Sequence, residues 1–398
     1  MNIDGQSKFD ADLPDGVYLN LDEGAYFRQR AMGSSDWTSL HFKKHGWWWQ
    51  SPHNPDYRRP EAKVLTYGSA LHAIMLEGLD AYEARFIVQP DPAEFDGLLT
   101  TTEDMQRALS DAGFNLSGSS KWKKPDWAAA MRVNMPDVPV WLNIMERFDA
   151  TKGDRQAITA IEDRQLRFMR SFALDDDTPD NADIRQIFSA DSGYPALAEV
   201  SIFATVEGVR RRWRIDRMFP TFDLDLKSLG KWSGRPLTYE TGEVMARRGW
   251  DIQRADYHDG RTKAYELIRA GRIYGGSIEQ RKWLETWPDQ FPKWDWVWLV
   301  YQKPDTSAGN APVLFPIWDD SEDINTASGM SVVRENGAHK LAKAKAFYRQ
   351  QVERFGLDRP WALISPLHHT DENRKPHIVL PHYIAEDAPP SSAAYDND

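Results

Sequence analysis

The alternation of apolar and polar residues from Ala198 to Ser228 predicts three consecutive antiparallel strands. Glu207-Gly208 fits a two-residue hairpin loop, because glycine readily adopts the positive φ that tight hairpins need. A second turn is expected at 219–222, Phe-Pro-Thr-Phe, since proline presets φ and cannot sit inside a central strand. These two turns set the register of all three strands.

That register places Glu199 opposite Asp216, and Asp216 opposite Asp225. Residues directly opposite one another emerge on the same face about 5 Å apart, so the three carboxylates form one row. Side chains alternate along a strand, which adds Lys227 to this face. The arginines expected there are Arg210, Arg212 and Arg214. The opposite face is expected to be apolar, with Val200, Ile202, Ala204, Val206, Trp213, Ile215, Leu224 and Leu226.

A row of three carboxylates needs a compensating cation, because like charges opposite one another destabilise a sheet. Magnesium is the simplest candidate, since it takes oxygen ligands and commonly bridges carboxylates to substrate phosphates. Lys227 would then orient or activate the attacking water, or stabilise the developing charge. The alternative is a surface sheet whose carboxylates are offset by the neighbouring arginines. The row therefore predicts a metal-assisted phosphodiesterase site or a plain charged surface.

The N-terminal 90 residues are expected to be mostly helical. Predicted segments are Tyr18–Arg30, a helix capped near Ser34, and Tyr67–Glu77, where Leu71, Ile74 and Met75 follow helical spacing and His72 lies off that stripe. The three consecutive tryptophans at 47–49 either fill a core, which is the commoner role of tryptophan, or stack on unpaired bases.

Residues 91–190 are less regular and predict a mostly helical insertion. Expected features are a helix through Ala112 capped near Thr101, a basic and aromatic stretch at Lys121–Trp127, a helix at Ile158–Arg170 and an acidic loop at Asp175–Asp177.

After the sheet, Gly234-Arg235-Pro236 breaks the chain and a helical stretch follows from Thr241 to about Ala270. It carries Gln253 and Tyr257 on one face. Trp296–Tyr301 predicts a strand covered on both faces, which Val313–Trp318 would pair with. The last helix, Ala338–Phe355, ends at Gly356, and the tail from Glu386 has a disorder-prone composition.

Composition narrows the class of protein. The 398 residues are 41% hydrophobic and 27% charged, enough for a large core, and the absence of cysteine excludes disulfide scaffolds and cysteine-based zinc sites. No signal peptide or membrane-spanning segment is evident, which predicts a cytoplasmic protein. The formal net charge of −11 argues against nucleic-acid binding through overall charge, so phosphate contacts would depend on local clusters of Lys and Arg.

Four short blocks resemble the PD-(D/E)-x-K superfamily nucleases of the RecE or exodeoxyribonuclease VIII type, related to the RecB nuclease domain and lambda exonuclease. They are Gly-Ser-Ala-Leu-His at 68–72, Ala-Glu-Val-Ser at 198–201, Arg-Ile-Asp-Arg at 214–217 with Asp-Leu-Lys-Ser at 225–228, and Gln-x-x-x-Tyr at 253–257. The blocks occur in the family's order and span about 190 residues. Ile215 and Ser228 depart from the family pattern, but neither replaces a ligand.

The resemblance implies a role for each matching residue. Asp216 and Asp225 would bind the catalytic Mg²⁺ with the Leu226 carbonyl, and Mn²⁺ would substitute. Glu199 and His72 would complete the metal environment. Lys227 would be the catalytic lysine, and the helix-borne pair of Gln253 and Tyr257 would contact the DNA end.

The fold expected is a mixed α/β, restriction-endonuclease-like core. Its parts are an N-terminal helical part (1–90), the insertion (91–190), the nuclease core (191–385) and the tail (386–398). The function expected is Mg²⁺-dependent exonucleolytic cleavage of linear double-stranded DNA, 5′ to 3′ by resemblance, yielding 3′ single strands for recombination. Implied partners are DNA ends, a single-strand annealing protein and copies of the chain in a homo-oligomer such as a ring. Open alternatives are an inactive DNA-binding or scaffold protein of the same fold, and a two-carboxylate glycosidase, which would leave Lys227 without a role.

Overall fold

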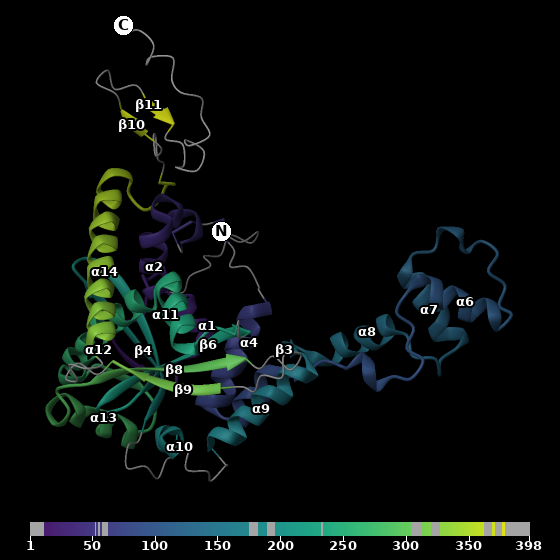
Figure 1. Cartoon of the computed structure of the whole chain (residues 1–398), viewed down its shortest axis with the longest axis horizontal. Coiled ribbons are helices and arrows are strands. Elements are labelled where there is room, and N and C mark those ends of the chain that lie inside the picture. Colours follow the sequence, from purple (N-terminus) through teal and green to yellow (C-terminus); the bar gives the residue numbers. More distant parts are fainter. Residues whose placement is uncertain are drawn as a thin grey trace, which may run out of the picture.

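A seven-stranded mixed sheet forms the centre of the molecule (Figure 1). The computed structural model describes residues 12–51, 53–54, 56–57, 63–174, 182–188, 196–231, 234–303, 313–319, 327–361, 368–370 and 376–378. The strand order is β7-β1-β4-β5-β6-β8-β9. The strands are β1 (Gly16–Leu19), β4 (Leu197–Val206), β5 (Val209–Met218), β6 (Phe222–Lys231), β7 (Ile273–Gly275), β8 (Asp295–Lys303) and β9 (Val313–Trp318). The expected α/β architecture with a central sheet is confirmed.

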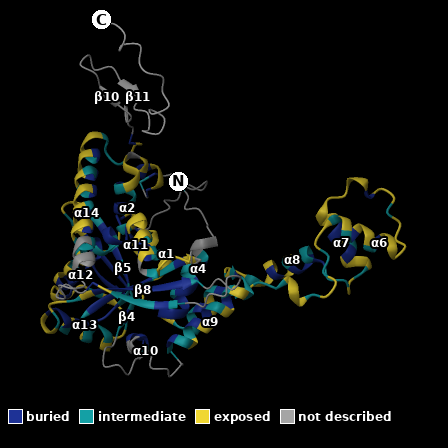
Figure 2. Ribbon diagram, viewed as in Figure 1, coloured by how far each residue is buried: buried dark blue, intermediate teal, exposed yellow. Residues whose placement is uncertain are grey.

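Helices cover both faces of this sheet, and the strand residues divide accordingly between two cores. The helices of the body are α1 (Glu23–Phe27), α2 (Ser34–Lys43), α3 (Trp47–Gln50), α4 (Lys63–His72), α5 (Leu79–Arg85), α9 (Ala160–Leu174), α10 (Ala182–Phe188), α11 (Leu237–Arg248), α12 (Trp250–Arg269), α13 (Ile278–Gln290) and α14 (Ala327–Phe355). One core joins α4, α9 and α10 to β6 and β8, and the other joins α12 and α13 to β4, β5 and β8. The central strands β4 and β8 are accordingly mostly buried (Figure 2), whereas most residues of the edge strand β9 are only partly buried.

The predicted strand at Trp296–Tyr301 is confirmed as part of β8. Val297, Leu299 and Tyr301 enter one core, and the alternating Trp296, Trp298 and Val300 enter the other. β8 runs parallel to β6 and antiparallel to β9. A strand covered on both faces needs apolar residues at every position, which explains the continuous apolar run.

The predicted register of the first hairpin is confirmed. Ala198 pairs with Arg217 and Val200 with Ile215, so Glu199 lies opposite Asp216 as expected. Glu207-Gly208 forms the turn, and both residues have positive φ, at 51° and 77°. These values are typical of the two-residue turns that match the twist of a hairpin.

The second hairpin follows the predicted register only next to its turn. Arg217 pairs with Leu224 and Met218 with Asp223, and the ladder between β5 and β6 ends there. Beyond this point β6 pairs with β8 instead. The expectation of one shared apolar face is therefore wrong: Leu224 and Leu226 belong to the α4 side, whereas Ile215 packs on the α12 side.

The N-terminal segment also departs from prediction. The helix expected over Tyr18–Arg30 is wrong at its start, because Tyr18 lies in β1, which pairs antiparallel with β4 and parallel with β7. Only Glu23–Phe27 is helical there. Buried residues on both faces of β1 fit a strand between two others, and such pairing depends on partners far away in sequence.

The tryptophan triplet mainly fills a core, as the commoner interpretation has it. Trp47 and Trp48 are buried against α14 and Trp361, whereas Trp49 remains 55% exposed. The predicted last helix is confirmed and begins earlier, at Ala327, ending before Gly356 with its φ of 72°. The acidic loop at 175–177 and the tail from 386 lie outside the described residues.

Much of the predicted insertion forms an arm that projects from the body (Figure 1). The arm contains α6 (Thr102–Asp111), α7 (Lys124–Asn134) and α8 (Trp141–Lys152), with a core of its own around Met105, Trp127 and Met131. At its base, β2 (Phe86–Val88) pairs in parallel with β3 (Gln156–Ile158). The next helix, α9, packs in the main core rather than in the arm.

Candidate functional site

His72 enters the site from the last turn of α4. The chain continues there as a π-helix, Ala73–Glu77, a wide turn often found at functional sites. The predicted stripe of Leu71, Ile74 and Met75 is buried, and His72 points away from it toward the sheet. Its Nε2 lies 3.1 Å from the Leu226 carbonyl oxygen, and its Nδ1 lies 3.6 Å from Asp216 Oδ2.

Glu199 occupies a distorted position in β4. Its φ is 52°, an uncommon left-handed conformation for a residue with a side chain, while both neighbours pair normally with β5. The carboxylate receives a hydrogen bond from Arg214 Nε and lies 3.9 Å from His72 Nδ1. Burial acts to raise the pKa of Glu199, but His72 and Arg214 outweigh it, so the pKa is lowered. Backbone strain of this kind clusters at functional sites.

Asp216 lies where β5 and β6 part. Its Oδ2 accepts a hydrogen bond of 2.8 Å from the Leu226 amide, which takes the place of the next ladder bond. Burial raises the pKa of Asp216 to about 7, with His72 opposing that shift and Asp225 and Glu199 adding to it. The carboxylates thus gather at the gap between the strands.

Asp225 connects the catalytic lysine candidate to α12. Lys227 Nζ lies 2.8 Å from its Oδ1 and 2.7 Å from its Oδ2, and Gln253 Nε2 donates to Oδ1 at 3.0 Å. Asp225 is 2% exposed. The ring of Trp250 lies 5.8 Å from Lys227 Nζ and closes the far side of the lysine. The ammonium group is therefore fixed by a carboxylate and an aromatic ring.

Tyr257 lies one helical turn after Gln253, as the i, i+4 spacing predicts. Its ring packs edge-on against Trp296, with centroids 5.5 Å apart. Burial raises the pKa of Tyr257 well above its ordinary value, and Asp216 and Asp225 add to the shift. Its hydroxyl consequently stays protonated and can donate a hydrogen bond.

The carboxylates around His72 favour its protonated form. Burial alone would lower its pKa, but Asp216 and Glu199 outweigh burial and raise the pKa of His72 to about 9. As an imidazolium it donates from both nitrogens, to the Leu226 carbonyl and toward the carboxylates. A proton on His72 therefore neutralises part of the charge that a metal ion would neutralise.

The residues present fit a hard divalent cation. His72, Glu199 and Asp216 each offer a ligand atom within 4.8 Å of the other two. The Leu226 carbonyl faces the same group, and Asp225 Oδ2 is buried without a well-aligned hydrogen bond. Carboxylate and carbonyl oxygens suit Mg²⁺, and Mn²⁺ also accepts imidazole.

The three arginines predicted to contact DNA are engaged within the protein. Arg210 pairs with Asp15 and the Leu13 carbonyl, and Arg212 donates to three carbonyls of the α1 segment at 3.0 to 3.3 Å. Arg214 holds Glu199. These contacts support the N-terminal segment and the site, and the DNA role of the arginines stays a prediction.

Arg261 and Asp223 form a clamp that was not predicted from the sequence. Arg261 is fully buried and donates to Asp223 at 3.0 Å and to the Phe219 and Pro220 carbonyls at 2.9 and 3.2 Å. It thereby ties α12 to the turn that sets the β5–β6 register. The signal was available, because Arg261 follows Gln253 and Tyr257 on the same helical face at the same spacing of four.

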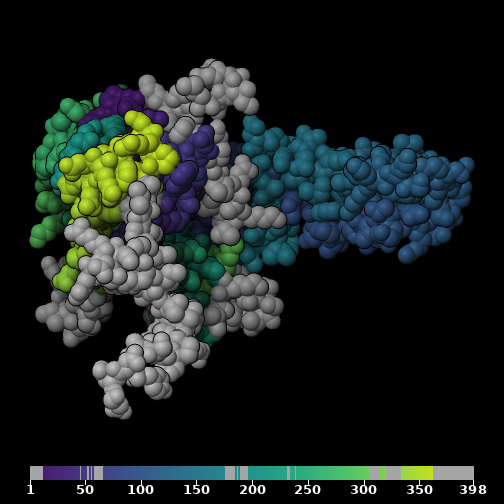
Figure 3. Space-filling view, turned by 90° about the horizontal axis from the view of Figure 1, so that it is seen from above, coloured from purple at the N-terminus to yellow at the C-terminus, as the bar shows by residue number. Residues whose placement is uncertain are grey.

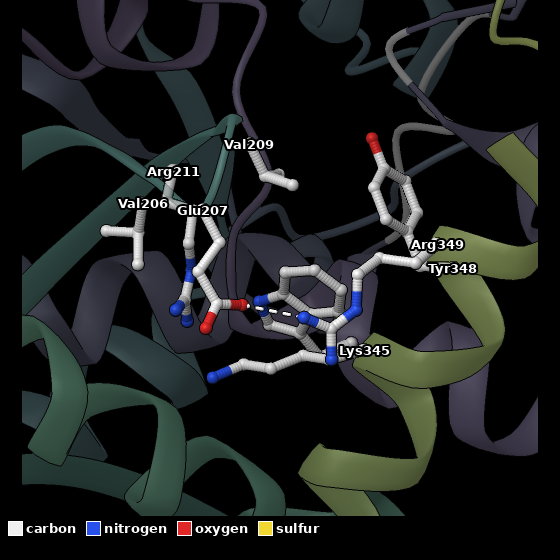
Figure 4. Close-up of a pocket in the computed structure, with 8 residues that line it drawn as sticks. Val206, Glu207, Val209, Arg211, Lys345, Tyr348 and Arg349 are labelled. Carbon is white, nitrogen blue, oxygen red and sulfur yellow. Dashed lines mark hydrogen bonds and ion pairs between the residues drawn. The ribbon is translucent and has the colours of Figure 1, made fainter. Parts of the chain in front are cut away.

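Two hollows lie apart from these residues. One, between the β4–β5 turn and α14, measures about 20 Å³, room for a single water, with Glu207 and Arg349 paired at 2.9 Å beside it (Figure 4). The other measures about 460 Å³ and lies in the arm, beside α7 and α8. Neither brings together a set of carboxylates with a lysine, so the candidate site remains at the parting of β5 and β6.

Within the part of the chain that the structure describes, no helix is long and apolar enough to cross a membrane. The chain matches no family model and no curated protein.

Proposed function

We propose that this protein is a Mg²⁺-dependent deoxyribonuclease with a restriction-endonuclease-like core, acting on the ends of linear double-stranded DNA. The observation that carries the proposal is the meeting of Asp225, Lys227 and Gln253 with the cluster of His72, Glu199 and Asp216. These six residues come from α4, β4, β5, β6 and α12. The order helix, three-strand meander, helix, parallel strand gives further support to the core assignment.

The residues divide the chemistry of phosphodiester hydrolysis among them. Asp216, Asp225, Glu199 and the Leu226 carbonyl would hold the ion, with His72 beside them. When bound, Mg²⁺ would supply a polarised water and offset the charge on the phosphate. In the reaction a bond forms between a water oxygen and phosphorus, and the bond from phosphorus to one sugar oxygen breaks.

Lys227 and α12 would position the phosphate. Lys227 is a cation fixed at the edge of the carboxylates, where it can donate hydrogen bonds to the negative charge that grows on the phosphate oxygens. Gln253 orients Asp225, and the protonated Tyr257 hydroxyl can donate to a DNA end. Lys227 has a role in this hydrolysis of a phosphodiester, whereas a two-carboxylate glycosidase mechanism would not need it.

The digestion polarity and the partners that we propose come from the resemblance to RecE-type nucleases. We propose 5′ to 3′ digestion leaving 3′ single strands, a single-strand annealing protein as partner, and a homo-oligomer such as a ring around the DNA. End-labelled duplexes would reveal the polarity, and sedimentation of the purified protein would give the number of copies.

The test of the proposed function is digestion of linear and covalently closed circular duplex DNA by the purified protein. With Mg²⁺ or Mn²⁺ we expect the linear duplex to be lost and the circle to survive, and with EDTA neither should change. A linear duplex that binds but stays intact with either ion would instead support the inactive scaffold. A linear duplex that neither binds nor is cut would overturn both readings.

The affinity for Mn²⁺ is expected to rise with pH up to about 9, and most steeply below about 7, because Asp216 is protonated below about 7 and His72 below about 9. Both pKa values are raised, so protons compete with the ion throughout the neutral range, and affinity should climb by up to about tenfold per pH unit for each proton displaced. Titration calorimetry in buffers of different ionisation enthalpy measures both affinity and proton release. His72→Gln should release fewer protons, and a wild-type affinity independent of pH would contradict the assignment.

A further inference from the structure

Three helices, α2, α11 and α14, pack around the N-terminal end of α12, beside the candidate site. A methyl group placed on Gly249, between α11 and α12, would lie 2.8 Å from Thr38 Cγ2 and 3.3 Å from Phe42 Cε2, so α2 packs directly on this junction. The next residue, Trp250, carries the ring that faces Lys227. α14 packs on both α2 and α12. Figure 3 shows the yellow surface of α14 on the same side of the body as the purple N-terminal segment.

The exposed charged side chains around this junction include a basic group that we call the rim patch. Its members are Lys43 and Lys44 at the end of α2, Arg247 and Arg248 in the last turn of α11, and Lys343 on α14, with the half-exposed ring of Phe42 among them. All five cations are exposed. None of them pairs with a carboxylate among the residues that the structure places. Lys43 instead donates to the neutral Gln50, at 2.6 Å.

The pKa of His41, next to the patch, is lowered by burial and by the positive charges around it. Burial lowers its pKa first, and Lys340, Lys44 and Lys343 lower it further, against the single opposing contribution of Asp251. Asp251 is already paired with Lys340, at 2.6 Å. On α11, Glu243 is likewise paired, with Arg235 at 2.8 Å. The unpaired charge on this face is therefore positive, on a chain whose formal net charge is −11.

We infer that the rim patch binds the sugar-phosphate backbone of the duplex next to the phosphate held in the candidate site. Exposed, unpaired Lys and Arg side chains are the groups that neutralise DNA phosphates, and their release of counterions supplies salt-dependent affinity. Arg247 and Arg248 come three and two residues before Trp250, whose ring lies 5.8 Å from Lys227 Nζ, so a duplex whose end reaches Lys227 would continue across α11 and α2. This inference rests on the proposed function and assigns it the surface that holds the substrate.

A second basic patch, at the tip of the arm, is the natural comparison. Lys121, Lys123 and Lys124 are exposed, with Trp122 39% exposed beside them. Three cations can therefore be removed from this tip, as many as are removed from the rim patch by a triple substitution. Within the described part of the chain, however, the tip lies on the projecting arm and not on the elements that hold the site, and the inference assigns it no phosphate contact.

The experiment compares two charge-matched triple variants in EDTA, where the DNA is not cut. One is Lys44→Gln/Arg247→Gln/Arg248→Gln and the other is Lys121→Gln/Lys123→Gln/Lys124→Gln. Fluorescence anisotropy with a labelled 30-base-pair duplex between 50 and 300 mM salt gives the affinity and its salt slope. For the rim variant we expect the slope to fall by about 2 to 3 and binding to weaken roughly tenfold to a hundredfold, since each phosphate contact contributes about 0.9 to the slope. The arm variant should stay within about twofold of wild type.

A conservative variant separates charge from shape. Arg247→Lys/Arg248→Lys keeps both charges and should keep the wild-type slope. With Mg²⁺, the rim variant should show a raised KM and a nearly unchanged kcat, because none of its residues touches the reacting atoms. A rim variant with the wild-type slope, while wild type still digests linear DNA, would overturn this inference and leave the proposed function standing. Failure of wild type itself to bind or cut the duplex would overturn the proposed function, and the inference with it.

Discussion

Lys227→Gln and Asp225→Asn are each expected to reduce hydrolysis of linear duplex DNA by about 10³-fold or more. Lys227 is the cation nearest the carboxylates that is fixed on two sides, by both oxygens of Asp225 and by the Trp250 ring. Asp225 in turn holds Lys227 and accepts from Gln253. Removing either member releases the other, so the two substitutions act on one unit.

The rate losses caused by the Lys227 and Asp225 substitutions are expected not to add. Because the pair acts as a unit, the double variant should be only slightly slower than either single variant, as measured by single-turnover digestion with Mg²⁺. Lys263→Gln, on α12, is the matched control: Lys263 pairs with Glu266 in the same helix, away from the carboxylates, so this variant should retain wild-type rates. Variants of Lys227 and Asp225 that cut at wild-type speed would remove these residues from the reaction.

The first hairpin could be predicted from sequence because its determinants are local. Glu207-Gly208 can form the tight turn without help from the rest of the chain, and once the turn exists the register of β4 and β5 follows. The edge of the sheet could not be predicted in this way. β1 is a four-residue strand held by β4 and β7, which lie roughly 190 and 260 residues further along the chain, so its local pattern carries little information.

Where β5 and β6 separate, the alternation of side chains no longer predicts which face of the sheet a residue of β6 occupies. Period-two alternation assumes that neighbouring strands remain paired, whereas here Leu224 and Leu226 turn into the α4 core because β6 follows β8. Asp216 gains the Leu226 amide at that same point. The structure brings together residues that the sequence pattern singled out, but the reason they meet, a gap between strands rather than a flat row, was not predicted.

The arginines illustrate a second limit. Their shared face with Asp216 was correctly predicted, yet the choice between a DNA phosphate and a protein partner depends on what else reaches that face. In the fold, the N-terminal segment brings Asp15 and the α1 carbonyls to Arg210 and Arg212, and Glu199 takes Arg214. Exposure, which sequence does not reveal, instead distinguishes the lysines and arginines of the rim patch.

Arg261→Met is expected to destabilise the protein by about 3 to 5 kcal/mol, because it leaves the buried carboxylate of Asp223 without its cation. The clamp also fixes the turn at 219–222 against α12, so DNA hydrolysis should fall along with stability. Burial raises the pKa of Asp223 to about 6, with Arg261 opposing the shift. Without Arg261 this pKa should rise further.

The sign of the pH dependence follows from that raised pKa. A carboxyl whose pKa is higher in the folded state binds its proton more tightly there, so stability falls as pH rises above the unfolded value near 3.8 and reaches its low plateau above the folded pKa. The Arg261→Met variant should therefore lose more stability at pH 7.5 than at pH 5.5, as measured by urea unfolding of the metal-free protein. Arg261→Met/Asp223→Asn should recover part of the loss, because no unpaired charge stays buried.

Arg269→Met is the control on the same helix. Since Arg269 and its partner Asp289 are 54% and 82% exposed, this substitution should cost less than about 1 kcal/mol. Equal losses for Arg261→Met and Arg269→Met would show that the clamp does not hold α12 to the turn.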